Sequence, residues 1–177
     1  LGELILSPPN TSDEVLSAPA PPKLLLAVFM SVISGRNPHY LIGEQVLAAP
    51  IVQDLDIETI STGYILIDGG AGSTVEFISG TRPLPMHRED IIVAHALAGQ
   101  YLGMKLIYLE AGSGAKEPVS TSIIKAVNKA INIPIIVGGG INTPEIAKSA
   151  VDAGASMVVT GTVIEQDPEH IKKFADA

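Results

Sequence analysis

A repeating unit in the second half of the chain limits the possible folds most strongly. Short apolar runs at Lys105–Leu109, Ile133–Val137 and Ser156–Thr160 each end in a turn that contains glycine. The first two runs are followed by amphipathic stretches with helical spacing, around Ile123–Ile131 and Ile146–Val151. A β-branched run, a glycine turn and a helix, recurring about every 25 residues, predict βα units of a parallel sheet. The chain is therefore predicted to be an α/β protein.

The first half repeats this pattern less regularly. We predict strands at Leu4–Leu6, Leu24–Val32 and Tyr64–Ile67, helices at Pro38–Ala49 and Arg88–Leu102, and loops at Ala18–Pro22 and Asp68–Gly72. The total is six strands in one domain, 1–177. An eight-stranded barrel, which takes about 250 residues, would need two more strands before Leu1. We therefore expect about 60 to 80 further residues upstream. We also expect that the 177 residues alone aggregate or show no Mg²⁺-dependent transferase activity.

Composition excludes several classes of function. The chain has 11 Lys and Arg against 19 Asp and Glu, a net charge of −8, which argues against a nucleic-acid-binding surface. It has no cysteine, which excludes disulfides, thiolate metal sites and cysteine nucleophiles, and suits a reducing, cytoplasmic location. No apolar run reaches the roughly 18 residues that span a bilayer.

Two neighbouring glycine-rich turns predict an anion site. Gly138–Gly140 precede Asn142 or Thr143, either of which can cap the next helix, and Pro144, which can occupy its first turn. Gly161–Thr162 follow one unit later. Unpaired N–H groups at such turns favour phosphate, and the loops after the last two barrel strands commonly bind one together. The alternative is that these glycines only permit tight turns.

Tyr108 and Glu110 are the strongest catalytic candidates. They lie two residues apart on one predicted strand, so their side chains point the same way, at the end where barrel enzymes place catalytic groups. The alternative is a solvated glutamate at a strand end. Arg88 suits either an anion contact or simple solvation, and Asp68 suits either function or ordinary turn chemistry.

A histidine, an apolar run and the spacing of the four histidines do not indicate a binding or metal site. His95 falls in the middle of a predicted helix and is interpreted as structural. Phe29–Val32 is predicted to be core rather than a ligand pocket. The four histidines do not have the spacing of metal ligands.

Several motifs together resemble one family. They are Tyr108–Ala115 (YLEAGSGA), Val137–Ile141, Val159–Glu165, Phe29–Val32, Arg36–Pro38, Ile42–Gln45 and Leu47–Pro50. The chain resembles the geranylgeranylglyceryl phosphate synthase family. It is more similar to the archaeal-type group than to the bacterial heptaprenyl enzymes.

This resemblance implies a TIM-barrel prenyltransferase, of which the chain supplies strands three to eight. Such enzymes join geranylgeranyl diphosphate to sn-glycerol 1-phosphate, with Mg²⁺ on the diphosphate, and form the first ether bond of archaeal membrane lipids. Tyr108 and Glu110 would hold the glycerol hydroxyls, with Glu110 accepting a proton. The phosphate would be held by Ser113 and by N–H groups of Gly138, Gly139, Gly140, Gly161 and Thr162.

The resemblance also implies a dimer or hexamer and a metal-binding Asp, which is expected upstream of Leu1. The chain departs from the family at Ser34–Gly35, where an Asn-Ser pair is usual, and in a longer segment between Asp68 and Gly80. Two alternatives stay open. One is a phosphate-binding or assembly subunit without activity, and the other is a barrel that acts on a sugar phosphate.

Overall fold

A single parallel sheet organises the described part of the chain. The computed structural model describes residues 26–161, 163–164 and 170–175, so the predictions for Leu4–Leu6 and Ala18–Pro22 fall outside it. The five strands are β1 (Leu26–Val32), β2 (Glu58–Leu66), β3 (Leu106–Glu110), β4 (Ile135–Gly138) and β5 (Met157–Val159). They pair in parallel in the order β1-β2-β3-β4-β5. The α/β prediction is confirmed.

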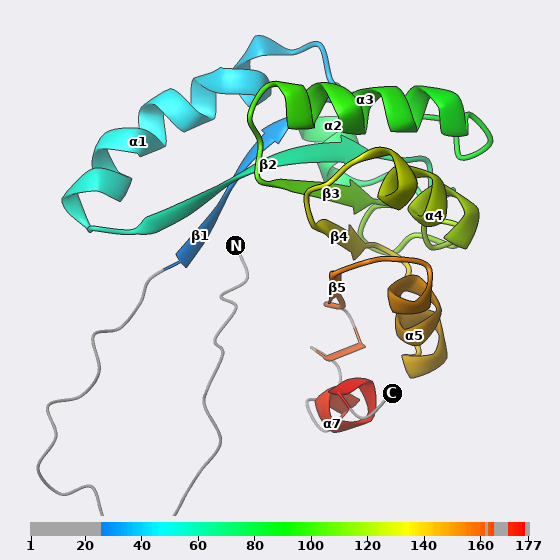
Figure 1. Cartoon of the computed structure of the whole chain (residues 1–177). Coiled ribbons are helices and arrows are strands. Elements are labelled where there is room, and N and C mark those ends of the chain that lie inside the picture. The colour runs from blue at the N-terminus through cyan, green and yellow to red at the C-terminus, as the bar shows by residue number, and fades with distance from the viewer. Residues whose placement is uncertain (1–25, 162, 165–169, 176–177) are drawn as a thin grey trace, which may run out of the picture.

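Helices connect the strands. They are η1 (His39–Gly43), α1 (Glu44–Asp54), α2 (Thr74–Ser79), α3 (Glu89–Tyr101), α4 (Thr121–Ala130), α5 (Pro144–Asp152) and α7 (His170–Ala175). Figure 1 shows α1, α3, α4 and α5 following one another around one side of the sheet. Strands paired in chain order under a single layer of helices form the wall of a TIM-type barrel, whereas a doubly wound sheet carries helices on both faces.

The two faces of the sheet have different roles. Ile65, Ile107, Leu109 and Val137 are at most 1% exposed and pack with α3, α4 and α5 in the hydrophobic core. Because side chains alternate along a strand, the residues between them point to the other face, the inner face of the barrel wall. Register joins Tyr64 to Tyr108, and Glu110 to Gly138, across that inner face.

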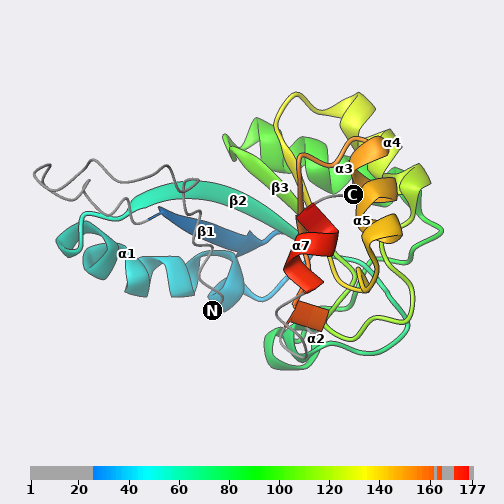
Figure 2. The same ribbon diagram turned by 90° about the horizontal axis from the view of Figure 1, so that it is seen from below.

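Two elements near the start of the sheet are longer than predicted. β2 begins at Glu58 rather than Tyr64. The stretch before Tyr64 is not apolar, but β1 pairs with it from Leu26↔Glu58 onward and so supplies the hydrogen bonds of a strand. The helix predicted at 38–49 is a π-helix, η1, that continues into α1 and runs past Pro50 to Asp54. Pro50 removes only one helical N–H donor, and α1 buries none of its residues. Figure 2 shows α1 beside β1 and β2, apart from the group of α3, α4 and α5.

The glycine-rich segment after β2 contains a helix that we did not predict. α2 begins after Ser73, whose Oγ accepts a hydrogen bond from the Glu76 N–H at 3.1 Å, and ends at Gly80 with φ 62°. Ser73 and Glu76 have the spacing of a capping box, and glycine is the usual residue just past a helix end. That signal was present in the sequence. None of the described helices is long and apolar enough to cross a membrane.

Candidate active site

Glu110 ends β3 and is buried on the inner face. Its side chain is 7% exposed, so the alternative of a solvated glutamate at a strand end is wrong. Oε1 accepts a hydrogen bond from the Gly112 N–H at 2.8 Å, and the Tyr108 hydroxyl donates another to the carboxylate. Both side chains approach Gly138 on the neighbouring strand, which confirms that they point the same way.

Burial makes the Glu110 carboxylate more basic than usual. Loss of solvent raises the pKa of Glu110, and the hydrogen bonds from Tyr108 and Gly112 offset part of that rise. Burial and the negative charge of Glu110 raise the pKa of Tyr108, so its hydroxyl stays protonated. A basic carboxylate beside a neutral donor can orient a hydroxyl group and accept its proton.

This burial predicts a pH-dependent difference in stability between the wild type and Glu110→Gln. Because the pKa is raised in the folded state, the protonated form of Glu110 favours folding. That contribution is complete below the ordinary glutamate pKa of about 4.3 and is lost as pH rises through the folded-state pKa. The variant has no such titration. Its Tm relative to the wild type should therefore increase as pH rises above about 4.3, as calorimetry would measure. A difference that does not change with pH would contradict the prediction.

Tyr64 is a third side chain at this site, beside Tyr108 and Glu110, and the sequence analysis did not identify it. It lies on β2 beside Tyr108, with ring centroids 5.2 Å apart at an interplanar angle of 66°. Burial, and then the charge of Glu110, raise the pKa of Tyr64. In the sequence Tyr64 stands alone within an apolar run, so only the register of β2 against β3 brings it to Glu110.

The turn after β4 approaches Glu110 closely. A Cβ added at Gly138 would lie 2.5 Å from Glu110 Oε2, and one added at Gly139 would lie 2.5 Å from Glu110 Oε1. Gly139 and Gly140 have φ of 80° and 71°, which favours glycine. Close packing and tight turning thus account for these glycines, and their binding of an anion stays a prediction.

Within the described residues, Ser113, Thr143 and Gly161 follow the carboxyl ends of β3, β4 and β5. Thr143 caps α5, with its Oγ1 accepting from the Ile146 N–H at 3.4 Å, and Pro144 occupies the first turn, as predicted. Ser113 and Gly161 are exposed, and Thr162 lies outside the described residues.

The structure gives the other candidates structural partners. Arg88 forms an exposed, two-bonded ion pair with Asp90, at 2.8 and 2.9 Å, which lowers the pKa of Asp90 to about 2. His95 Nδ1 lies 2.7 Å from the Ile91 carbonyl oxygen within α3, in line with a structural role. Asp68 Oδ1 accepts from the Gly70 N–H at 2.9 Å, which is ordinary turn chemistry.

An apolar pocket of about 260 Å³ adjoins Tyr64. The sheet contributes Met30, Val32 and Tyr64 to its lining. The helices contribute the apolar Val75 and Ile78 and the polar Tyr40, Glu44, Gln45, Thr74 and Ser79. The prediction that Phe29–Val32 is core is therefore wrong: Met30 is 41% exposed and faces this pocket. The reason is that β1 places Met30 and Val32 on the inner face, in register with Thr62 and Tyr64, and not against the helices.

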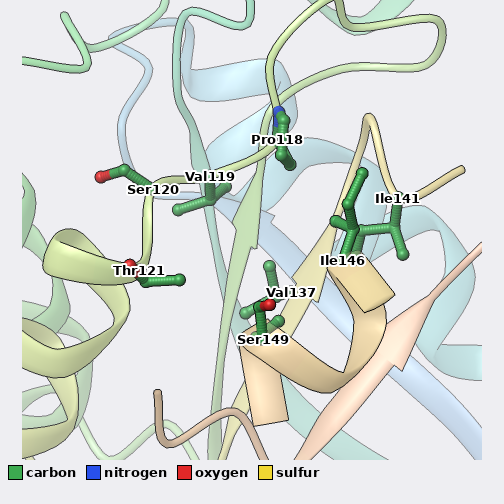
Figure 3. Close-up of a pocket in the computed structure, with 9 residues that line it drawn as sticks. Pro118, Val119, Ser120, Thr121, Val137, Ile141, Ile146 and Ser149 are labelled. Carbon is green, nitrogen blue, oxygen red and sulfur yellow. The ribbon is translucent and has the colours of Figure 1, made fainter. Parts of the chain in front are cut away.

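A second pocket, of about 150 Å³, lies between the starts of α4 and α5 (Figure 3). Val119, Val137 and Ile141 line it and also belong to the core between the sheet and the helices. This pocket is therefore on the opposite face of the sheet from Glu110, and it is separate from the candidate active site.

The described residues do not form a carboxylate cluster for a metal. They contain no group of three or more His, Cys, Asp or Glu side chains placed to hold an ion. Glu110 is the acidic group at the candidate site, and one of its oxygens already accepts from Gly112. The described residues alone therefore do not form a Mg²⁺ site.

Two known proteins with similar sequences have the same name. A Spirosoma linguale protein named geranylgeranylglyceryl phosphate synthase is 50% identical over 148 residues, which are 84% of this chain and 59% of that protein. A Thermococcus gammatolerans protein of the same name is 49% identical over 138 residues, 78% of this chain and 54% of that protein. The relatives are thus both bacterial and archaeal, so this similarity does not assign the chain to archaea.

A solved structure extends the similarity to the fold. It is the crystal structure of (S)-3-O-geranylgeranylglyceryl phosphate synthase from Thermoplasma acidophilum in complex with its substrate sn-glycerol-1-phosphate. The TM-score is 0.77 at 38% identity, over 83% of this chain and 59% of that one. The chain thus spans 54% to 59% of the length of these three proteins. A family model described as PcrB matches residues 14–177. The chain belongs to the PcrB family.

Proposed function

We propose that the protein joins geranylgeranyl diphosphate to sn-glycerol 1-phosphate and forms the first ether bond of a membrane lipid. The observation that carries this proposal is a chain of contacts: the buried Glu110 is hydrogen-bonded to Tyr108, whose ring contacts Tyr64 in the wall of a mostly apolar pocket. A polar acceptor site and an apolar donor site would thereby lie side by side. The names of the relatives and the glycerol-phosphate complex of the similar Thermoplasma acidophilum enzyme support this assignment.

The acceptor would bind between Glu110 and the turn after β4. The glycerol hydroxyls would contact Tyr108 and Glu110, which already form one hydrogen-bonded pair. The phosphate would lie against the N–H groups of Gly138–Gly140 and of Gly161–Thr162, with Ser113 nearby. The start of α5, nine residues long and capped by Thr143, adds a favourable helix dipole for an anion at this edge.

The reaction follows from the position of Glu110. As the bond between the allylic carbon and the diphosphate oxygen breaks, the diphosphate leaves with the electron pair. The glycerol hydroxyl oxygen forms the new ether bond to that carbon, and its proton passes to Glu110. Holding the hydroxyl on a buried carboxylate fixes its direction of attack and keeps water away from the reactive carbon.

The donor chain would begin in the 260 Å³ pocket. Glu44 and Gln45 also line this pocket, but most of its accessible wall is apolar, with Met30, Val32, Val75 and Ile78, which suits a hydrocarbon better than a sugar. With Tyr64 at the pocket wall, the reactive end of the donor would point toward Tyr108 and Glu110.

A transfer assay on the intact protein tests the proposal. Incubation with geranylgeranyl diphosphate and sn-glycerol 1-phosphate should yield the prenyl ether, identified by mass spectrometry. The glycerol 3-phosphate isomer and sugar phosphates should be poor acceptors. Binding of sn-glycerol 1-phosphate without transfer would instead indicate an inactive phosphate-binding subunit. Preference for a sugar phosphate would indicate a different barrel enzyme.

We also propose that the reaction requires Mg²⁺, on the basis of the family resemblance. Mg²⁺ would neutralise charge on the departing diphosphate. Treatment with EDTA should abolish transfer, and added Mg²⁺ should restore it, as followed by product formation. Full activity in EDTA would contradict this requirement.

Two further properties are proposed on the same basis. The protein would form a homo-oligomer, a dimer or hexamer, in the cytoplasm. The exposed apolar side chains Val46, Leu47 and Ile51 of α1 offer a surface for such contacts. Sedimentation analysis of the intact protein would measure the oligomeric state.

A further inference from the structure

Tyr64 occupies a position that the roles of Glu110 and Tyr108 leave unexplained. It lines the apolar pocket, and its ring contacts that of Tyr108, whose hydroxyl donates to Glu110. Register places Tyr64 directly beside Tyr108, so both rings are on the inner face of the sheet. Tyr64 therefore stands at the junction between the pocket and the buried carboxylate.

The proposed reaction, on which this inference rests, creates a positive charge at that junction. When the carbon–oxygen bond to the diphosphate breaks, the electron pair leaves with the diphosphate and the allylic carbon becomes cationic. The accessible wall of the pocket is mostly apolar, although Glu44 and Gln45 also line it, so it offers the charge few polar groups. The face of an aromatic ring attracts a cation within about 6 Å without forming a bond to it.

We propose that the aromatic ring of Tyr64 stabilises the developing allylic cation of the donor. Tyr64 suits this role better than Tyr108, because Tyr64 lines the pocket and Tyr108 does not. Burial raises the pKa of Tyr64, so the hydroxyl keeps its proton and does not act as a nucleophile.

The proposal predicts that activity follows the electron density of the ring at position 64. Tyr64→Phe keeps the ring and should retain kcat within about 3-fold, whereas Tyr64→Leu should lose about 30-fold, the size of a desolvated cation–ring contact. Phenylalanine analogues with one, two and three ring fluorines, incorporated at this position, should lower kcat step by step. The KM for glycerol phosphate should not change.

The fluorine series separates this role from packing. Fluorination weakens the attraction of the ring face for a cation but keeps the ring apolar and nearly the same size. A packing role therefore predicts a constant kcat across the series. Tyr101, at the end of α3 and 78% exposed, is the matched control, and the same series there should have no effect.

Each outcome has a separate meaning. An intact wild-type protein that performs no prenyl transfer overturns the proposed function itself. If the wild type is active, a flat fluorine series or an active Tyr64→Leu variant overturns only the role of Tyr64. A stepwise fall in kcat with unchanged Tm supports it.

Discussion

Glu110→Gln is expected to lower kcat for prenyl transfer by about 10²-fold or more, the usual effect of removing a positioned general base. Glutamine has the same shape, and its amide oxygen can still accept the hydrogen bond that Gly112 donates to Glu110 Oε1. The substitution therefore removes basicity and charge while leaving the shape of the site in place. The KM for glycerol phosphate should change less than kcat, because the hydroxyls keep a polar partner.

Steady-state kinetics on the intact protein measure this effect. Glu117→Gln is the matched control: Glu117 lies on the loop that follows β3, and it is exposed. Its rate should stay within about 2-fold of the wild type, because surface changes away from a site have small effects. A normal rate for Glu110→Gln would show that Glu110 is structural. A large loss of folding stability together with a normal specific activity of the folded protein would show the same.

Local patterns in the sequence predicted the parts of this site that depend on one element. Alternation along a strand placed Tyr108 and Glu110 on the same face, and the Thr143–Pro144 pair predicted the start of α5. Helix capping would also have found α2 from Ser73 and Gly80, had the glycines before it not dominated the interpretation. These features need no knowledge of the neighbouring strands.

The parts that we missed depend on how separate elements meet. Tyr64 and Tyr108 are neighbours only because β2 and β3 pair with Tyr64 opposite Tyr108, a register that neither strand encodes alone. The inner-face position of Met30 likewise follows from its pairing with Thr62. The burial of Glu110 also depends on its neighbours, since β4 places Gly138 directly opposite it.

Gly138→Ala is expected to abolish most activity, by about 10²-fold or more, by displacing the Glu110 carboxylate that acts as general base. Gly138 lies within β4 and is not among the glycines with positive φ, so alanine fits its backbone. The added Cβ, however, would lie 2.5 Å from both Glu110 Oε2 and Tyr108 Oη, closer than such atoms can approach. These two side chains must therefore move, while the helix-side core is untouched. Stability should fall by only about 1 to 3 kcal/mol, the usual cost of overpacking.

Gly103→Ala is the control: φ there is 87° and nothing lies within 4 Å of the added Cβ, so it should lower Tm without lowering kcat. Kinetics and calorimetry on both variants would measure the contrast. A fully active Gly138→Ala variant would show that the site tolerates displacement of Glu110 and that the carboxylate does not need its present position.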